Sequence, residues 1–171
     1  MNVERLDASQ TTKFIPQLSA LLQDVVAGGA SVGFLPPLAA EEAAAYWQSV
    51  AEALREPYRI LLVAREAGAI VGTVQLDLAS RPNGSHRAEV AKLMVHSAHR
   101  RQGLGRRLMQ AIEAEAHSAG RTTLVLDTRQ GDPSERLYVS LGYLKAGSIP
   151  EYARSADGTL HTTAFLYKLL K

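Results

Sequence analysis

Two glycines and four arginines lie close together after an apolar run. Gly103 and Gly105 open a segment with helical apolar spacing, and they are flanked by Arg100, Arg101, Arg106 and Arg107. The first N–H groups of a helix have no partner within the helix, and they carry the positive end of its dipole. Glycines leave these groups open to close approach, and arginines add charge-assisted contacts. The segment therefore predicts a binding site for a phosphate or pyrophosphate group.

Two other phosphate-binding motifs do not fit this segment. The Gly-Lys-Ser/Thr ending of a Walker loop is absent. A dinucleotide-binding fingerprint needs three glycines after the first strand of a βαβ unit, with an acidic residue about twenty residues later. Here only two glycines are present, and more than one predicted strand precedes them. The site must belong to another class of fold.

The elements around the glycine segment predict a mixed sheet. Apolar runs and alternation predict strands over 2–6, 60–64, 70–78, 87–95, 122–127, 143–148 and 160–169. Helical spacing predicts helices over 9–26, 41–54, 103–119 and 133–141. A helix that connects 87–95 with 122–127 implies that these two strands are parallel. The predicted class is α/β, with six or seven mostly antiparallel strands flanked by helices.

Composition limits what kind of protein this is. The chain has 171 residues, of which 46% are hydrophobic and 21% charged, as in an ordinary globular protein, so we expect one domain over 1–171. No apolar run reaches the roughly 20 residues that span a bilayer, and the start lacks a secretory signal. We therefore expect a cytoplasmic protein without a membrane partner. Zero cysteines exclude disulfides and a covalent acyl-cysteine.

The spacing Arg100-x-x-Gly103-x-Gly105 resembles the signature of the GNAT acetyltransferase family. The order of elements along the whole chain and the downstream run Leu137-Tyr138-x-x-Leu141-Gly142-Tyr143 resemble it as well. The resemblance implies acetyl-CoA as co-substrate and no metal. It places the cofactor's pantetheine between splayed strands at 89–95 and 122–127. The implied cofactor contacts are Leu93, Met94, Val95, Arg100, Arg101, Gln102, Gly103, Leu104, Gly105 and Arg106.

Three side chains are candidates for the chemistry. An alkylammonium has a pKa near 10.4, so an amine must lose a proton before it attacks a thioester. The resemblance implies that Glu89 or Asp127, on the two flanking strands, takes this proton. From the residues alone, Glu89 could instead pair with Arg87 or Lys92, and Asp127 could simply end its strand. The resemblance also implies that Tyr138 protonates the departing thiolate, although a half-buried tyrosine could equally anchor its helix.

Several shorter segments resemble the tabtoxin-resistance acetyltransferases, a narrower group within the family. They are Gly28–Phe34, Pro82–Gly84, Arg87–Val90, Lys92–Val95, Leu126–Thr128 and Leu160–Ala164. This resemblance implies a small, amino-acid-like acceptor such as tabtoxinine-β-lactam, and a role in toxin or antibiotic resistance. The GNAT resemblance implies that the loop over 28–34 borders the acceptor site, which makes Ser31 and Phe34 candidate substrate contacts. The match over 160–164 adds His161, for which surface exposure or strand packing is an equal alternative.

The sequence thus predicts acetyl transfer from acetyl-CoA to a small-molecule amine. Transfer is expected within a ternary complex, because no cysteine can carry the acetyl group. Two alternatives stay open: acetylation of a protein N-terminus or lysine, and a non-catalytic sensor of acyl-CoA. We expect a monomer or homodimer. The net charge of +2 and the compact arginine cluster argue against a nucleic-acid partner.

Overall fold

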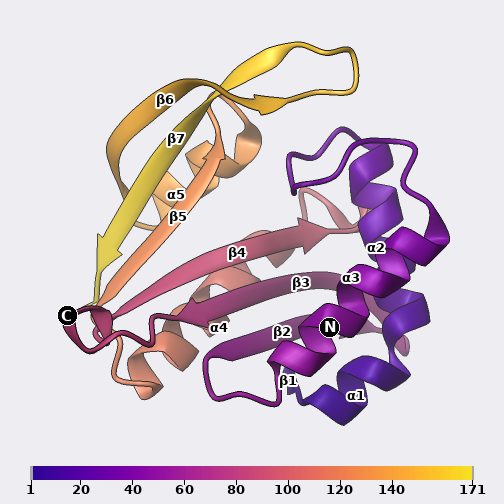
Figure 1. The fold of residues 1–171 in the computed structure, drawn as a ribbon, viewed down its shortest axis with the longest axis horizontal. Coiled ribbons are helices and arrows are strands. Elements are labelled where there is room, and N and C mark those ends of the chain that lie inside the picture. Colours follow the sequence, from indigo (N-terminus) through magenta and orange to yellow (C-terminus); the bar gives the residue numbers. More distant parts are fainter. Residues whose placement is uncertain (1, 171) are drawn as a thin grey trace.

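A computed structural model describes residues 2–170. The strands of these residues form one twisted sheet (Figure 1). Among these residues the strand order is β1-β2-β3-β4-β5-β7-β6. The strands are β1 (Asn2–Leu6), β2 (Arg59–Glu66), β3 (Ala69–Leu78), β4 (Arg87–Val95), β5 (Thr123–Arg129), β6 (Leu144–Arg154) and β7 (Leu160–Leu169). The β4–β5 pair is parallel, and the other neighbours are antiparallel. The predicted fold class is confirmed.

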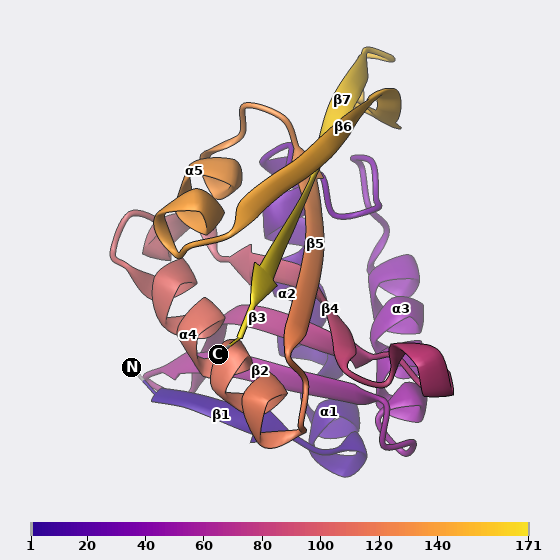
Figure 2. The ribbon, with the colours of Figure 1, turned by 90° about the vertical axis from the view of Figure 1, so that its left-hand side faces the viewer.

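Helices cover both faces of this sheet (Figure 2). One layer holds α1 (Ala8–Lys13), α2 (Ile15–Ala27) and α3 (Ala40–Ala53); the other holds α4 (Leu104–Ser118) and α5 (Pro133–Ser140). The single helix predicted over 9–26 is wrong, because the chain breaks at Phe14. Pro16 has no N–H to donate to the preceding turn, and its ring would clash with the carbonyl four residues earlier.

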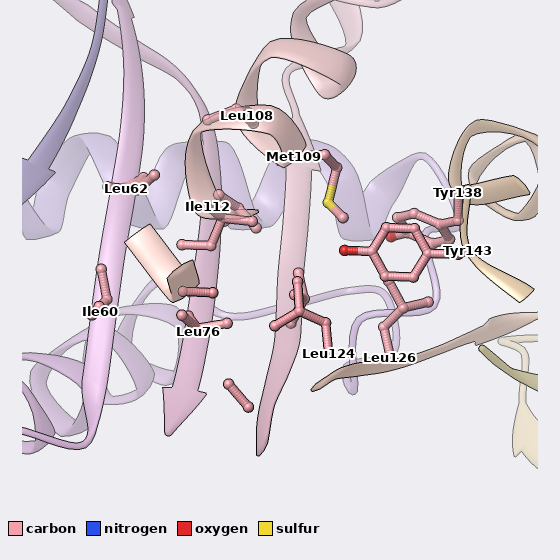
Figure 3. Packing of buried hydrophobic residues seen from close by; sticks show 14 of the residues in the cluster. Ile60, Leu62, Leu76, Leu108, Met109, Ile112, Leu124, Leu126, Tyr138 and Tyr143 are labelled. Carbon is pink, nitrogen blue, oxygen red and sulfur yellow. The ribbon is translucent and has the colours of Figure 1, made fainter. Parts of the chain in front are cut away.

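Strand alternation divides the core into two clusters. On one face, Leu108, Met109 and Ile112 of α4 pack over the sheet, where they meet strand residues such as Leu76 and Leu124 (Figure 3). On the other face, the fully buried Trp47 of α3 packs with strand residues such as Leu61 and Val63. Helices therefore pack against both faces of the central strands. This packing sets the positions of the ends of β4 and β5 that border the functional site.

The parallel strands β4 and β5 separate soon after they start (Figure 1). Their pairing covers Arg87↔Thr123, Ala88↔Leu124 and Glu89↔Val125, and it stops there. Beyond this point the two strands diverge, so the later residues of β4 no longer have β5 as a hydrogen-bonding neighbour. The splayed parallel pair expected from the sequence is therefore present.

A β-bulge interrupts β4 on its other side. Thr73 of β3 pairs with Met94, but Gln75 pairs with Ala91, so β4 contains one extra residue here. Lys92 lies within the bulge and has a φ of 52°. A bulge breaks the alternation of side chains between the two faces of the sheet. Side chains that follow Ala91 are therefore directed differently from those in a regular strand.

Candidate active site

A cleft of about 1200 Å³ lies where β4 and β5 part. It is lined by β4, the β4–α4 loop, the start of α4, β5, α5, the α2–α3 loop and part of the β6–β7 hairpin. The lining includes Leu93, Met94, Val95, Arg100, Arg101, Gly103, Leu104, Gly105 and Arg106. Most residues predicted to contact a cofactor thus meet in one cavity. Gln102 does not line it, because its side-chain amide turns back to donate to the carbonyl of Ala98 at 3.3 Å.

The glycine loop leaves the N-terminus of α4 open. Gly103 has a φ of 78°, a conformation that glycine adopts without strain. The first helical hydrogen bond runs from the N–H of Arg107 to the carbonyl of Gly103 at 3.1 Å, so the N–H groups of residues 104–106 have no acceptor within the helix. A Cβ on Gly103 would meet no atom within 4 Å. The loop therefore has room, donors and positive potential for a diphosphate.

Side chains far apart in the sequence hold this loop in place. The Asp24 carboxylate at the end of α2 accepts hydrogen bonds from the N–H and the hydroxyl of Ser97, both at 2.7 Å. Burial raises the pKa of Asp24, but these bonds and the positive His96 and Arg100 outweigh it, so the net shift is downward. Arg106 donates to the Ser140 hydroxyl at 2.7 Å, which joins α4 to α5.

Glu89 and Asp127 share one face of the sheet. Ala88 and Val90 are buried against α4, so the side chain of Glu89, between them, points to the opposite face. Glu89 lies beside Val125 in the parallel register, and Asp127 follows two residues later on the same face. Both carboxylates line the cleft. The structure therefore brings the two predicted acids to the point where the strands separate.

The surroundings of Glu89 shift its pKa upward. Burial raises its pKa, and the negative charges of Asp77 and Asp127 raise it further. Asp77 lies directly beside Glu89 on β3 and accepts a hydrogen bond from Arg59 at 2.5 Å. A carboxylate with a raised pKa is a stronger base when it is ionised, which is the property required of a general base.

Tyr138 lies on α5 with its side chain 7% exposed, and it borders the cleft. Its ring packs against Tyr143, with ring centroids 5.9 Å apart (Figure 3). Burial raises the pKa of Tyr138 well above its usual value, and the charge of Asp127 adds to the shift. The hydroxyl therefore stays protonated and can donate a hydrogen bond into the cleft.

The predicted substrate residues are not all at the cleft. Ser31 lines it, but Phe34 and His161 do not. Phe34 is partly buried and packs edge-on against Tyr46 of α3, with ring centroids 5.3 Å apart, at the edge of the core cluster that contains Trp47. His161 lies on β7 opposite Ala153 of β6, and Ala153 lines the cleft together with Tyr152 and Thr163, but His161 itself is not among the lining residues.

Arg129 is a cleft residue that sequence reasoning missed. Its guanidinium donates to Asp132 at 3.0 Å, to the Ser155 hydroxyl at 3.2 Å and to the Gly29 carbonyl at 3.4 Å. It thereby joins β5 to the β6–β7 hairpin and to the α2–α3 loop. Asp132 occupies the N-cap position of α5, where its side chain makes no capping bond and pairs with Arg129. Only the short Arg129–Asp132 spacing was visible in the sequence; the longer contacts were not.

Between residues 2 and 170, no group of three or more His, Asp or Glu side chains is arranged to hold a metal ion. No helix in that range is both long enough and apolar enough to cross a bilayer.

Comparisons with known proteins agree with this geometry. The profile of the family described as "Acetyltransferase (GNAT) family" matches residues 30–143. A protein of Azospirillum brasilense described as an uncharacterized N-acetyltransferase in the hisH-hisA intergenic region is 36% identical over 132 residues, 76% of this chain and 76% of that protein. The solved structure of aminoglycoside 6'-acetyltransferase type Ii is 26% identical, with a TM-score of 0.71 over 99% of this chain and 97% of that one.

A second solved structure, an acetyltransferase of Salmonella typhimurium with its cofactor acetyl-CoA, is 22% identical. Its TM-score is 0.79 over 100% of this chain and 94% of that one, which shows the shared fold. The family profile covers the segment that forms the glycine loop, both splayed strands and α5. With the fold, the cleft and the Azospirillum relative, it shows that this chain is an N-acetyltransferase of the GNAT family.

Proposed function

We propose that this enzyme transfers the acetyl group of acetyl-CoA directly to the primary amine of a small molecule. Toxins and antibiotics such as tabtoxinine-β-lactam are the first candidates as acceptors. The observation that carries the proposal is the single cleft in which the glycine loop and the carboxylates of Glu89 and Asp127 meet. When bound, acetyl-CoA supplies an activated thioester, and the protein has to hold it and deprotonate the amine.

The residues of the cleft divide between these two tasks. The open N–H groups after Gly103, with Arg100, Arg101 and Arg106, bind the pyrophosphate. Residues 93–95 of β4 have lost β5 as a neighbour, so their backbone can bond the amide groups of pantetheine. Glu89 acts as general base, because its pKa is raised by burial and by Asp77 and Asp127. Asp127 orients the ammonium, and Tyr138 donates a hydrogen bond to the departing sulfur.

Arg129 supports a small acceptor over a protein. It bridges the α2–α3 loop at Gly29 and the β6–β7 hairpin at Ser155, two segments that border the cleft. An extended peptide needs an open groove in which several residues can lie side by side. The hydrogen bonds of Arg129 join two walls of the cleft and would interrupt such a groove. A compact amine needs only the part of the cleft that these bonds leave open.

Release of CoA thiol from acetyl-CoA tests the proposal across a panel of acceptors. We expect kcat/KM for small amines, tabtoxinine-β-lactam among them, to exceed kcat/KM for peptides with free N-termini or lysines by about tenfold or more. A difference of this size corresponds to the loss of a few contacts between the acceptor and the cleft. A higher kcat/KM with peptides would show a protein acetyltransferase instead. Tight cofactor binding without turnover on any amine would show a sensor.

Cofactor binding at the glycine loop has its own test. Acetyl-CoA should raise the melting temperature, because it binds the folded chain alone. Combining Arg100→Ala with Gly105→Asp should weaken binding by about tenfold or more, since a positive charge is lost and a negative one is placed among the phosphate donors. The double variant should still fold, because a Cβ at Gly105 approaches only the flexible end of Leu137, at 3.2 Å.

The control for this measurement is Arg107→Ala, which removes an exposed arginine of the same helix that does not line the cleft. We expect it to leave the shift in melting temperature unchanged. An undiminished shift in the double variant would place the cofactor elsewhere on the molecule.

A further inference from the structure

The bulge in β4 directs Lys92 into the cleft. Val90 is buried against α4, and regular alternation would turn the side chain of Lys92 into that same apolar core. The bulge turns it to the other face, where its Nζ lies 5.8 Å from the centroid of the Tyr46 ring. The φ of 52° at Lys92 is one that residues other than glycine rarely adopt, and such backbone strain clusters at functional sites.

The Lys92 ammonium is a partly buried cation within the cleft. Among residues 2–170 it takes part in no ion pair, although it lines the cleft. A Cβ on Gly33 would lie 3.7 Å from its Nζ, so the α2–α3 loop passes close over it. Burial lowers the pKa of Lys92, while the carboxylates around it act in the opposite direction. A partly desolvated cation without a direct partner gains most from an anion that enters the cleft.

The other charges at this end of the cleft determine which charges a bound ligand can carry. Asp127, Asp77, Arg59 and Glu89 all act electrostatically on Lys92. Arg59 and Asp77 are hydrogen-bonded to each other and together carry no net charge. Arg87 also acts on Glu89 but does not line the cleft. The interacting charges that do line it are two carboxylates, Glu89 and Asp127, and one ammonium, Lys92. A cavity with both signs of charge is complementary to a zwitterion.

We infer that the acceptor carries a carboxylate as well as its amine, and that Lys92 binds this carboxylate. The ammonium of such an acceptor faces Glu89 and Asp127, and its carboxylate faces the bulge. The chemical class is therefore an amino acid or a close analogue. This inference rests on the proposed function. The sequence resemblance already implied an amino-acid-like acceptor, and the new element is the assignment of its carboxylate to Lys92. Lys92 is then a specificity-determining residue that takes no part in bond making.

Matched pairs of acceptors test the inference with the unmodified enzyme. Suitable pairs are methionine with methioninamide, phenylalanine with phenethylamine, and lysine with cadaverine. We expect the member with a carboxylate to have a kcat/KM about 10- to 100-fold higher, the usual contribution of a charge-assisted hydrogen bond. Methioninamide is a stringent comparison for methionine. Its ammonium group is more acidic than that of methionine, so a larger share of its amine is unprotonated and able to react.

Variants then assign the preference to Lys92. Lys92→Gln should lower the ratio of kcat/KM within each pair by about tenfold, mainly through the KM of the carboxylated member. Lys92→Arg keeps the charge and should retain most of the ratio. Lys13→Gln removes an exposed lysine of α1 outside the cleft, and it should leave the ratio unchanged. Circular dichroism of each variant confirms that it is folded.

The outcomes separate this inference from the function on which it rests. Equal efficiency on both members of each pair overturns the carboxylate site and leaves acetyl transfer to small amines intact. The absence of thiol release with every amine overturns the proposed function, and the inference with it. Lys92 could instead act only as a counter-ion of Glu89. Lys92→Gln would then move the pH profile equally for both members and leave the ratio unchanged, which also overturns the inference.

Discussion

Glu89→Gln should lower kcat by about a hundredfold or more and abolish the acidic limb of the pH–rate profile. The amide keeps the size of the carboxylate but cannot take a proton from the ammonium. In the native enzyme the base is active only when ionised, so the rate rises with pH through its pKa. Burial and the charges of Asp77 and Asp127 raise that pKa, so the limb should lie above the usual range of glutamate. Steady-state rates across a pH series measure both effects.

Asp127→Asn should have a different signature, which separates the two acids. Removal of its negative charge lowers the pKa of Glu89, so the acidic limb should persist and move to lower pH. The KM for the amine should rise, because a partner of the cation is lost. If the two variants exchange these signatures, Asp127 is the base. If both keep the kcat and KM of the unmodified enzyme, the acids lie outside the chemistry even though the cofactor site stands.

The control for both acids is Glu41→Gln, which neutralises an exposed carboxylate at the start of α3 outside the cleft. It should change neither kcat nor the position of the acidic limb. A shift in this variant would show that the pH profile reports the total charge of the protein.

The parts of the site that follow from short-range patterns were predictable. Local patterns of a few consecutive residues predict the glycine loop and the helix after it. The same holds for the strands that bear Glu89 and Asp127. The break at Phe14 was also local, but helical apolar spacing continues across Pro16 and obscured it. A proline was the signal that should have ended the predicted helix.

The rest of the cleft depends on contacts between distant residues. The bond from Ser97 to Asp24 joins residues 73 apart, and the bond from Arg129 to Gly29 joins residues 100 apart. The side chain of Lys92 reaches the cleft only because β3 and β4 pair with one extra residue in β4. Strand alternation read from the sequence alone places it on the opposite face. Register and tertiary contacts, which no single segment specifies, therefore assemble the acceptor side of the site.

Tyr138→Phe should reduce kcat by about 10- to 100-fold with little change in the binding of acetyl-CoA. The substitution removes one hydroxyl and leaves the ring packed against Tyr143. The raised pKa of Tyr138 keeps the hydroxyl protonated, so it can donate to the departing thiolate throughout the working range of pH. Single-turnover measurements at saturating acceptor isolate this step from product release.

Tyr143→Phe is the matched control for Tyr138→Phe, because it removes a buried tyrosine hydroxyl from a residue that does not line the cleft. We expect it to change the melting temperature but to alter the single-turnover rate by no more than about twofold. A change in a buried side chain outside the cleft affects the stability of the fold more than the chemical step. A loss of rate in both variants would show that packing around α5 controls turnover. A loss confined to Tyr138→Phe requires its hydroxyl at the sulfur, since the two rings lie in contact and share the same surroundings. An unchanged rate in Tyr138→Phe would instead limit Tyr138 to anchoring α5.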